Sequence, residues 1–220
     1  MVDRRTPDRA RAAQLADLRA RQAAKERRSR AVIIAVSATA VVGLVVGAGA
    51  VIVNESRRQS AVEQAANQPI AGVEETTDLS SDHVAAVPEP TPEEAGGTVL
   101  PPVGGDHDPV PQNCGVYAEP VATANAVHSL EHGAVWITYR PDLAQAQVDV
   151  LTELARGEGY VLLSPFPDLA APVVLTAWGV QLQVDDAADP RVEPFLVKYV
   201  QGEQTPEPGA PCSGGVGEPS

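Results

Sequence analysis

The longest hydrophobic run in the chain is AVIIAVSATAVVGLVVGAGAVIV, residues 31–53, which contains no charged side chain. At about 1.5 Å per residue, a helix over this run measures about 34 Å, which is longer than the ~30 Å hydrocarbon core of a bilayer. The pattern predicts one transmembrane helix over 31–53. A cleaved signal peptide is the alternative, because Ala48-Gly49-Ala50 fits an A-x-A cleavage site. Both the apolar run and the charged segment before it are long for a signal.

The next hydrophobic region alternates between two strand-like runs and one helical pattern. GAVWITY and YVLLSPF, at 133–139 and 160–166, are rich in β-branched and aromatic residues, which favour strands. Between them, residues 141–159 place apolar side chains at helical spacing, with Pro141 suited to the first helical position. A strand, a helix and a strand joined by a single crossover predict parallel neighbours in one sheet.

The last hydrophobic region predicts further strands and a closing helix. APVVLTAWGVQLQV, residues 171–184, predicts either one bent strand or two strands hinged at Gly179. DPRVEPFLVKYV, residues 189–200, predicts a helix with Asp189 as its N-cap and Pro190 at its first position. The predicted order is therefore β-α-β-β-α, which is typical of a small α/β sandwich.

Three polar segments flank these regions. Residues 54–78 are rich in Gln, Ala and Glu and contain no aromatic residue, which is typical of a flexible tether. Residues 79–113 are rich in Pro, Gly and acids, and their composition alone predicts disorder. The end of the chain, residues 203–220, is a low-complexity tail that includes TPEPGAPCSGGVGEPS.

Charge is distributed unevenly along the chain. The first 30 residues carry ten basic and four acidic side chains, a net charge of +6, whereas the whole chain carries −13. Since Lys and Arg concentrate before the apolar run, the positive-inside rule predicts a single-pass cell-membrane protein with a cytoplasmic N-terminus and an external C-terminal domain. The basic segment suits anionic lipid heads, and the acidic remainder argues against nucleic acid as a partner.

The chain contains two cysteines, Cys114 and Cys212, both C-terminal to the apolar run. An oxidising compartment and an even number of cysteines favour a disulfide between them. This bond would tie the tail to the front of the domain, with a loop-closure contribution of about 4–5 kcal/mol at most. Thiolate metal ligation or redox chemistry is the alternative, although neither cysteine has a second thiol beside it in the sequence.

The motif HSLEHG carries the most chemistry. His128 and His132 stand four residues apart, so a helix places both imidazoles on one face, with Glu131 leaning to the same side. Asn125 is suited to cap this helix and Gly133 to end it. Two imidazoles and a carboxylate suit a divalent cation. The alternative is a plain helix end at which the histidines bind backbone carbonyls.

The same motif matches the inverted zincin pattern H-x-x-E-H, in which the glutamate is a general base. A distant acid, here Glu193 or Glu203, would be the third metal ligand. We reject this interpretation because the pattern requires a long helix on a large fold with a cleft. In this chain a glycine and a predicted strand follow the motif directly, and no G-x-S-x-G nucleophile motif is present.

Several short motifs together resemble a known family. They are DHV (82–84), PPVGGDH (101–107), CGVY (114–117), HSLEHGAVWITYRP (128–141), SPFPDL (164–169) and TAWG (176–179). In order and spacing over about residues 80–200 they resemble the bacterial domain-of-unknown-function family 3105, and H-x-LEHG-x-V-x-x-x-Y is the most specific piece. The resemblance implies an exported, usually membrane-anchored domain with no known activity.

The resemblance moves the start of the domain back to residue 79 and implies that residues 79–113, hereafter the front loop, are ordered on the core. The family pattern has a tyrosine soon after DHV and an aromatic residue before Cys-Gly, and their absence here weakens the expected packing around His83. The expected segments are a basic cytoplasmic part, a membrane span, a tether, the exported domain and a tail, at 1–30, 31–53, 54–78, 79–202 and 203–220.

All four histidines of the chain fall on family motifs, and together they would complete a Cu(II) or Zn(II) site. The expected metal ligands are His128, His132, His107, Glu131 and His83. A soft Cu(I) thioether site is not expected, because Met1 is the only methionine. The alternative is a buried polar network in which the histidines bond to Glu131, Asp106 or Tyr117.

Three functions follow from these expectations. The first is a metal-binding module that buffers or hands on copper or zinc outside the membrane. The second is an interaction protein that docks a partner in the cell envelope, with structural histidines. The third is a hydrolase that uses a metal-bound water. We favour the first, keep the second as the alternative and assign no catalytic residue.

Overall fold

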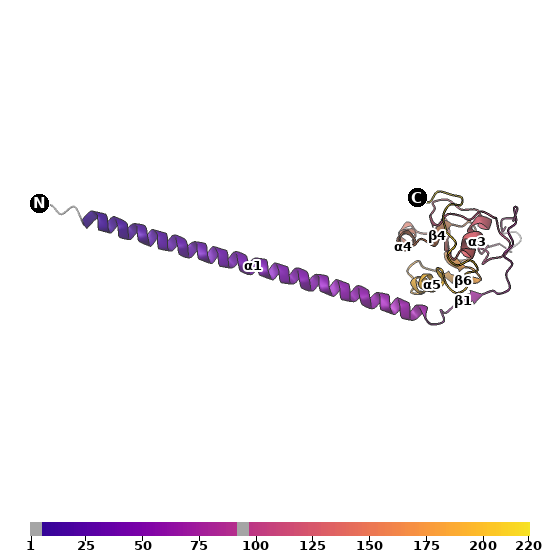
Figure 1. Ribbon diagram of the computed structural model, residues 1–220, viewed down its shortest axis with the longest axis horizontal. Helices are drawn as coiled ribbons and strands as arrows, with labels where there is room; N and C mark the ends of the chain where they lie inside the picture. The colour runs from indigo at the N-terminus through magenta and orange to yellow at the C-terminus, as the bar shows by residue number, and fades with distance from the viewer. Residues whose placement is uncertain (1–5, 92–96) are drawn as a thin grey trace. The chain divides into compact units, whose positions relative to one another are not determined.

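The computed structural model of the chain describes residues 6–91 and 97–220, and within this range it gives all side chains except those of 6–10, 12, 13 and 31–42. Compactness divides the chain into two units, Met1–Gln59 and Ser60–Ser220. The described part of the first unit is helical, and the strands of the described residues all belong to the second (Figure 1).

Helix α1, Thr6–Ala66, contains the long apolar run within its 61 residues. The structure corrects the prediction of a transmembrane helix over 31–53. Among the described residues, no helix has a stretch that is both long and apolar enough to cross a membrane. The side chains of 31–42 lie outside the described set.

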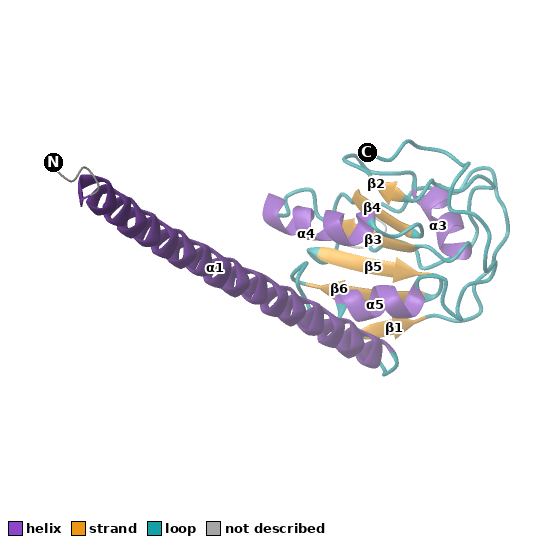
Figure 2. Ribbon diagram, turned by 60° about the vertical axis from the view of Figure 1, so that its left-hand side comes forward, coloured by secondary structure: helices purple, strands orange, loops and turns teal. Residues whose placement is uncertain are grey.

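The second unit is built on a mixed six-stranded sheet with the order β1-β6-β5-β3-β4-β2 (Figure 2). The strands are β1 Val73–Glu75, β2 Gly115–Val116, β3 Val135–Tyr139, β4 Val161–Pro165, β5 Val173–Ala177 and β6 Val180–Val184. Strands β2, β3 and β4 run parallel, whereas β5, β6 and β1 are joined by antiparallel pairs. The fold is therefore mixed α/β, with two short edge strands, β1 and β2, that the hydrophobic pattern did not predict. Strand β1 lies in the segment predicted as a tether.

The predicted strand–helix–strand unit is present. Helix α4, Gln145–Arg156, connects β3 to β4, and these two strands pair in parallel. The helix does not begin at Pro141, because residues 141–143 form a turn. In this turn the Leu143 N–H donates to the Arg140 carbonyl at 3.0 Å. The first predicted helical turn is thus a separate structure, and the crossover itself is as expected.

Strands β5 and β6 form a hairpin rather than one bent strand. Trp178 and Gly179 make its turn, and Gly179 has φ +69°, a left-handed conformation that favours glycine. Helix α5, Val192–Tyr199, follows, but Asp189 is not its N-cap. The Asp189 carboxylate accepts from the Arg191 N–H at 2.9 Å and pairs with the Arg191 guanidinium at 2.7 Å, so it stabilises the turn before the helix.

The two faces of the sheet have different covers, because successive side chains of a strand point to opposite sides. Ile137 of β3 points to the helical face, where it packs in one core with Leu151 of α4 and Phe195 of α5. Trp136 points to the loop face, which is covered by helix α3, Thr123–Glu131, and by the front loop. Full burial of a Leu, Ile or Phe side chain stabilises the fold by about 1.5–3 kcal/mol.

The front loop, described at 79–91 and 97–113, is ordered on the loop face, as the family resemblance implied and its composition did not. Isolated β-bridges pair His83 with His107 and join Val99 to the loop that follows β4. Val99 is almost fully buried in the core of the loop face. A segment that is poor in regular structure is therefore fixed by a few buried contacts and bridges.

The predicted disulfide joins Cys114 to Cys212, which lie 98 residues apart in the sequence. The Cys114 N–H donates to the Cys212 carbonyl at 2.9 Å, and the Val216 N–H donates to the Pro111 carbonyl at 2.9 Å. The low-complexity tail is therefore bound to the end of the front loop. Neither sulfur remains as a thiolate ligand for a metal.

Candidate metal centre

Helix α3 supplies the centre of the site, because HSLEHG forms its last turn. His128 and Glu131 lie within the helix, and His132 is its C-cap. The helix ends there because Gly133 has φ +92° and its N–H returns to the Leu130 carbonyl at 2.9 Å. The predicted helix end at Gly133 is confirmed.

The predicted cap at Asn125 is wrong. The N-cap of α3 is Ala122, and no side chain caps the helix. The Asn125 side chain instead donates to the Val110 carbonyl of the front loop at 2.7 Å. Together with the Ser129 hydroxyl, which donates to the Gln112 carbonyl at 2.6 Å, it holds the front loop against α3.

The front loop brings two more imidazoles to this helix. His83 and His107 pair as a parallel bridge, in which the Val84 N–H donates to the His107 carbonyl at 2.7 Å and the His107 N–H to the Asp82 carbonyl at 3.1 Å. The bridge sets both rings against α3. His83 stacks on His128 with ring centroids 4.7 Å apart, and His107 lies 4.9 Å from the same ring.

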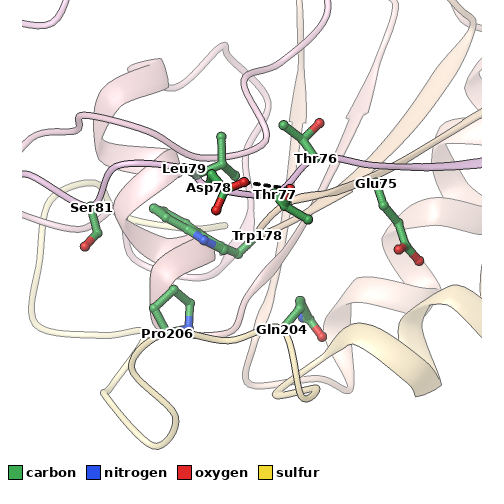
Figure 3. A pocket seen from close by; sticks show the side chains of 10 residues that line it. Glu75, Thr76, Thr77, Asp78, Leu79, Ser81, Trp178, Gln204 and Pro206 are labelled. Carbon is green, nitrogen blue, oxygen red and sulfur yellow. Dashed lines mark hydrogen bonds between the residues drawn. The ribbon is translucent and has the colours of Figure 1, made fainter.

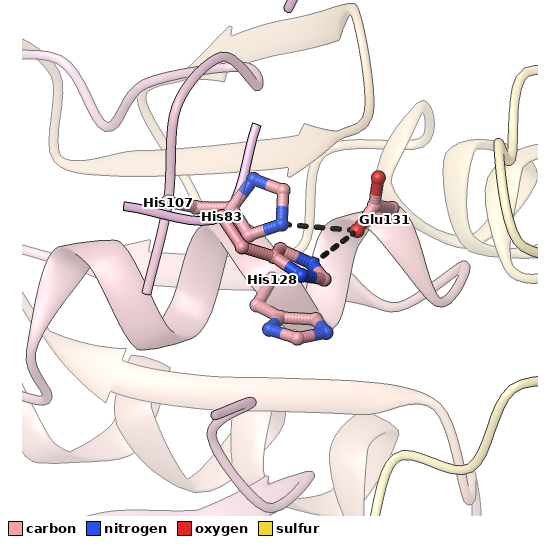
Figure 4. Close-up of side chains that lie close together, drawn as sticks. All are labelled: His83, His107, His128 and Glu131. Atoms are coloured by element: carbon pink, nitrogen blue, oxygen red, sulfur yellow. Dashed lines mark hydrogen bonds and ion pairs between the residues drawn. The ribbon is translucent and has the colours of Figure 1, made fainter. Parts of the chain in front are cut away.

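Four of the predicted ligands meet at one point. Among the described residues, one nitrogen each of His83, His107 and His128 and one oxygen of Glu131 lie within 4.8 Å of one another (Figure 4). Glu131 Oε2 is 2.9 Å from His107 Nε2 and 3.5 Å from His83 Nε2. The His107 and Glu131 side chains are 0% and 4% exposed, whereas His83 is 45% exposed. The group is therefore buried except on the side of His83.

Backbone carbonyls orient three of the imidazoles. In His107, His128 and His132, Nδ1 lies 2.7, 2.7 and 2.8 Å from a backbone carbonyl oxygen. The acceptors are the carbonyls of Gly105, Asp108 and Pro211, in the same order. Since a carbonyl oxygen only accepts, each Nδ1 carries a hydrogen, and in a neutral ring Nε2 keeps a lone pair. Metal-binding histidines are commonly oriented in this way.

The rings of His128 and His132 make a contact in which two neutral imidazoles cannot form a hydrogen bond. Their Nε2 atoms are 3.0 Å apart, the distance of a hydrogen bond, yet both are acceptors once Nδ1 carries the hydrogen. Burial lowers the pKa of His128, against the opposing effect of its bond to the Asp108 carbonyl, and the neighbouring imidazoles lower this pKa further. A proton on His128 is therefore disfavoured, and a metal cation would satisfy both lone pairs.

His132 is the one predicted ligand that lies outside the group of four. Its Nε2 contacts His128 on one side and lies 3.6 Å from Glu207 Oε2 on the other. Nothing in the sequence singled out Glu207, because it belongs to the low-complexity tail. The disulfide was the available signal, since it predicted that the tail returns to the front of the domain.

The polar-network alternative is supported at Glu131, which contacts His107 at 2.9 Å, whereas Tyr117 and the zincin candidate Glu203 make other contacts. The Tyr117 hydroxyl donates to the Asn113 carbonyl at 2.8 Å, so its hydrogen bond goes to the front loop rather than to an imidazole. Glu203, a third ligand in the zincin interpretation, is exposed and lines a pocket beside Lys198. Helix α3 has nine residues, which is too short for the long helix of that pattern.

Trp178 contacts the group from the hairpin turn. Its indole lies edge-on to the His107 ring, with centroids 5.9 Å apart. The same indole lines a pocket of about 440 Å³ whose walls include Asp78, Leu79 and Pro206 (Figure 3). An ion bound at His107 would therefore lie close to a fluorescent side chain.

Comparison with known families identifies the chain. A family model described as a protein of unknown function (DUF3105) matches residues 97–214, more than half of the chain. The match includes both cysteines, Glu131 and every predicted histidine ligand except His83. No significant match is found among the curated proteins or the solved structures. The chain therefore belongs to the DUF3105 family of proteins of unknown function, as its motifs indicated.

Proposed function

We propose that the protein is a histidine-based module that binds a divalent ion, Cu(II) or Zn(II). The observation that carries the proposal is the 3.0 Å contact between the Nε2 atoms of His128 and His132. Each ring already places its Nδ1 on a backbone carbonyl, so neither Nε2 supplies a hydrogen while both rings are neutral. A cation there turns the repulsion of two lone pairs into two ligand bonds. The contact of His107 with Glu131 is weaker support, because a proton on that imidazole would also make it an ion pair.

The donor set favours these two metals. Imidazole nitrogens and a carboxylate suit both, whereas the disulfide removes both thiolates and Met1 is the only methionine. At ligand distances of about 2.0–2.1 Å, nitrogens 3.0 Å apart subtend roughly 90–97° at the ion. This angle is nearer to the tetragonal geometry of Cu(II) than to the tetrahedral geometry of Zn(II).

A structural role for the imidazoles is the second candidate. Their Nδ1 bonds join α3 to the front loop through Asp108 and to the tail through Pro211, as a buried polar network would. The protein would then be a non-enzymatic interaction protein of the cell envelope. The two candidates differ in what the protein loses when the imidazoles are removed.

We also propose that the domain resides in an oxidising compartment outside the cytoplasm. The disulfide between Cys114 and Cys212 supports this, because disulfides persist mainly where thiols are not kept reduced. Both metals named above are compatible with such a compartment, since neither depends on a thiolate ligand here.

Elemental analysis of the full-length protein, purified in oxidised form without a His tag, tests the metal proposal. We expect about one mole of Cu or Zn per mole of protein, as for a single site, and almost none in the double variant His128→Ala/His132→Ala. The control is Ser129→Ala, which removes a hydrogen bond of the same helical turn but no ligand. A metal-free wild-type protein, with a lower melting temperature in the double variant, would establish the structural role instead.

A further inference from the structure

The ligand atoms of the loop face form a continuous line from the surface to the buried group. Glu207 Oε2 lies 3.6 Å from His132 Nε2, which lies 3.0 Å from His128 Nε2. The line continues to Glu131 Oε2, which lies within 4.8 Å of the His128 ligand atom, and ends 2.9 Å further on at His107 Nε2. The two outer steps, of 3.6 and 3.0 Å, are short enough for one ion to hold a donor on either side, because two ligand bonds of about 2.0–2.1 Å span up to about 4.2 Å.

Exposure decreases along this line. The Glu207 side chain is 53% exposed and that of His132 is 10% exposed, whereas the inner members are buried. The outer end is also the charged end, since the Glu207 carboxylate faces solvent. A cation arriving at this end therefore meets an exposed anion first and the less exposed nitrogen of His132 next, whereas the opposite side of the group is open at His83, a neutral imidazole in the absence of a proton.

The outer pair is held in place by the folded tail rather than by chance proximity. The Glu207 N–H donates to the Glu131 carbonyl at 3.1 Å, which ties the tail to the end of α3. The Pro211 carbonyl accepts from His132 Nδ1 at 2.8 Å and so turns Nε2 of this ring toward His128. The neighbouring Cys212 anchors the same segment through the disulfide.

We propose that Glu207 and His132 form an outer site that captures a divalent cation and passes it to the buried group. The inference rests on the proposed metal-binding function and adds how the ion arrives. The carboxylate of Glu207 gives the first ligand bond and Nε2 of His132 the second. His128 then replaces Glu207, and the inner ligands replace His132. No bond other than ligand bonds is made or broken, and no proton has to leave a neutral Nε2.

The rate of ion uptake tests the outer site separately from the affinity. Cu²⁺ is mixed with the full-length protein in a stopped-flow instrument, and the quenching of tryptophan emission is followed. Trp178 reports arrival, because its indole lies 5.9 Å from the His107 ring. The variant is Glu207→Gln, which removes the charge and keeps the size of the side chain. The matched control is Glu203→Gln, an exposed acid of the same tail.

We expect the Glu207→Gln variant to take up Cu²⁺ at least about threefold more slowly, with the same final copper content and the same final quenching. The Glu203→Gln variant should match the wild type. Added salt should slow the wild type more than Glu207→Gln, because the removed charge is the one that salt screens.

Two results would overturn the outer site alone. One is an equal uptake rate in all three proteins, and the other is a lower copper content in Glu207→Gln with an unchanged uptake rate, which would make Glu207 a permanent ligand. A wild-type protein that takes up no Cu²⁺ would overturn the proposed function, and the outer site with it. The uptake rate therefore tests the outer site, whereas the final copper content tests the proposed metal-binding function.

Discussion

The helical face and the loop face of the sheet are covered in different ways. Two helices, α4 and α5, cover the helical face, and its buried core consists of apolar and aromatic side chains. The loop face is covered by the short helix α3, the front loop and the tail. Helices satisfy their own backbone groups, whereas loops offer free carbonyls, and three of these carbonyls orient the imidazoles. The imidazoles can be buried on this face because the loops that cover it supply backbone carbonyls as hydrogen-bond acceptors.

The loop face gains this chemistry with its buried polar side chains held close to possible hydrogen-bond partners, the His128–His132 contact included. Burying a polar group costs free energy unless it is hydrogen-bonded. Among the described residues, Thr205 Oγ1 is the one buried side-chain polar atom that has no hydrogen-bond partner. The two faces therefore differ in what they bury, apolar side chains on the helical face and imidazoles on the loop face, and in what holds their cover in place. The following changes test this difference.

The largest effect is expected on the helical face. The change Phe195→Ala removes a fully buried ring, so the free energy of unfolding should fall by about 3–5 kcal/mol. Guanidinium denaturation measures this loss. Metal content per folded molecule should not change, because the ring packs away from the histidines. A loss of metal from the folded variant would show that the two faces are coupled.

The next effect is expected on the loop face, from the double change Cys114→Ser/Cys212→Ser. Removing the disulfide should lower the free energy of unfolding by about 2–4 kcal/mol, because the unfolded chain gains freedom. Hydrogen exchange should rise in the front loop and the tail but not in α4 or α5. Equal exchange increases on both faces would contradict the view that the disulfide holds only the loop face.

A smaller effect is expected at the end of α3. Gly133 has φ +92°, and a Cβ there would meet the side chains of Gln201 and Thr205. We expect Gly133→Ala to lower the melting temperature, with a cost of about 1–3 kcal/mol. The control is Gly209→Ala, where φ is +86° but nothing lies within 4 Å, so only the backbone strain remains. Equal costs in both variants would show that the contact at Gly133 contributes nothing.

The smallest effect is expected from pH, in metal-free protein. The pKa of His128 is lowered in the folded state, mainly by burial, so the unfolded state binds this proton more readily. The contribution of His128 to stability should be present above the unfolded value of about 6.5 and should be lost as the pH falls below it. Denaturation midpoints between neutral and mildly acidic pH measure the slope. The slope should be smaller in His128→Gln, and an unchanged slope would assign it to other groups.

Hydrophobic periodicity predicted the interior of the fold better than its edges. Strands β3 and β4 were predictable because each is a continuous run of buried residues. Strands β1 and β2 have three and two residues, and their own composition favours no strand. Their pairing is decided by the outer edges of β6 and β4, which offer backbone groups to a further strand. Edge strands of this length cannot be recognised without their partners.

The candidate site divides in a similar way. Helical spacing was enough to bring His128 close to His132 on one side and to Glu131 on the other. His83 and His107 were predicted only from family motifs, because they stand in a segment without periodicity. Glu207 was not predicted, since its place depends on the return of the tail. Local spacing thus predicts contacts within one helix, whereas contacts between loops depend on bridges and the disulfide.

The bond between Cys114 and Cys212 also determines how the domain would respond to a pulling force. It closes residues 114–212 into a covalent ring that contains five of the six strands. Tension between the two ends of the chain would pass from one sulfur to the other and bypass this ring. The front loop and β1 lie in the path of the force. Stretching would therefore pull on β1 and on the front loop, and so draw His83 and His107 away from Glu131, while the five strands inside the ring stayed folded.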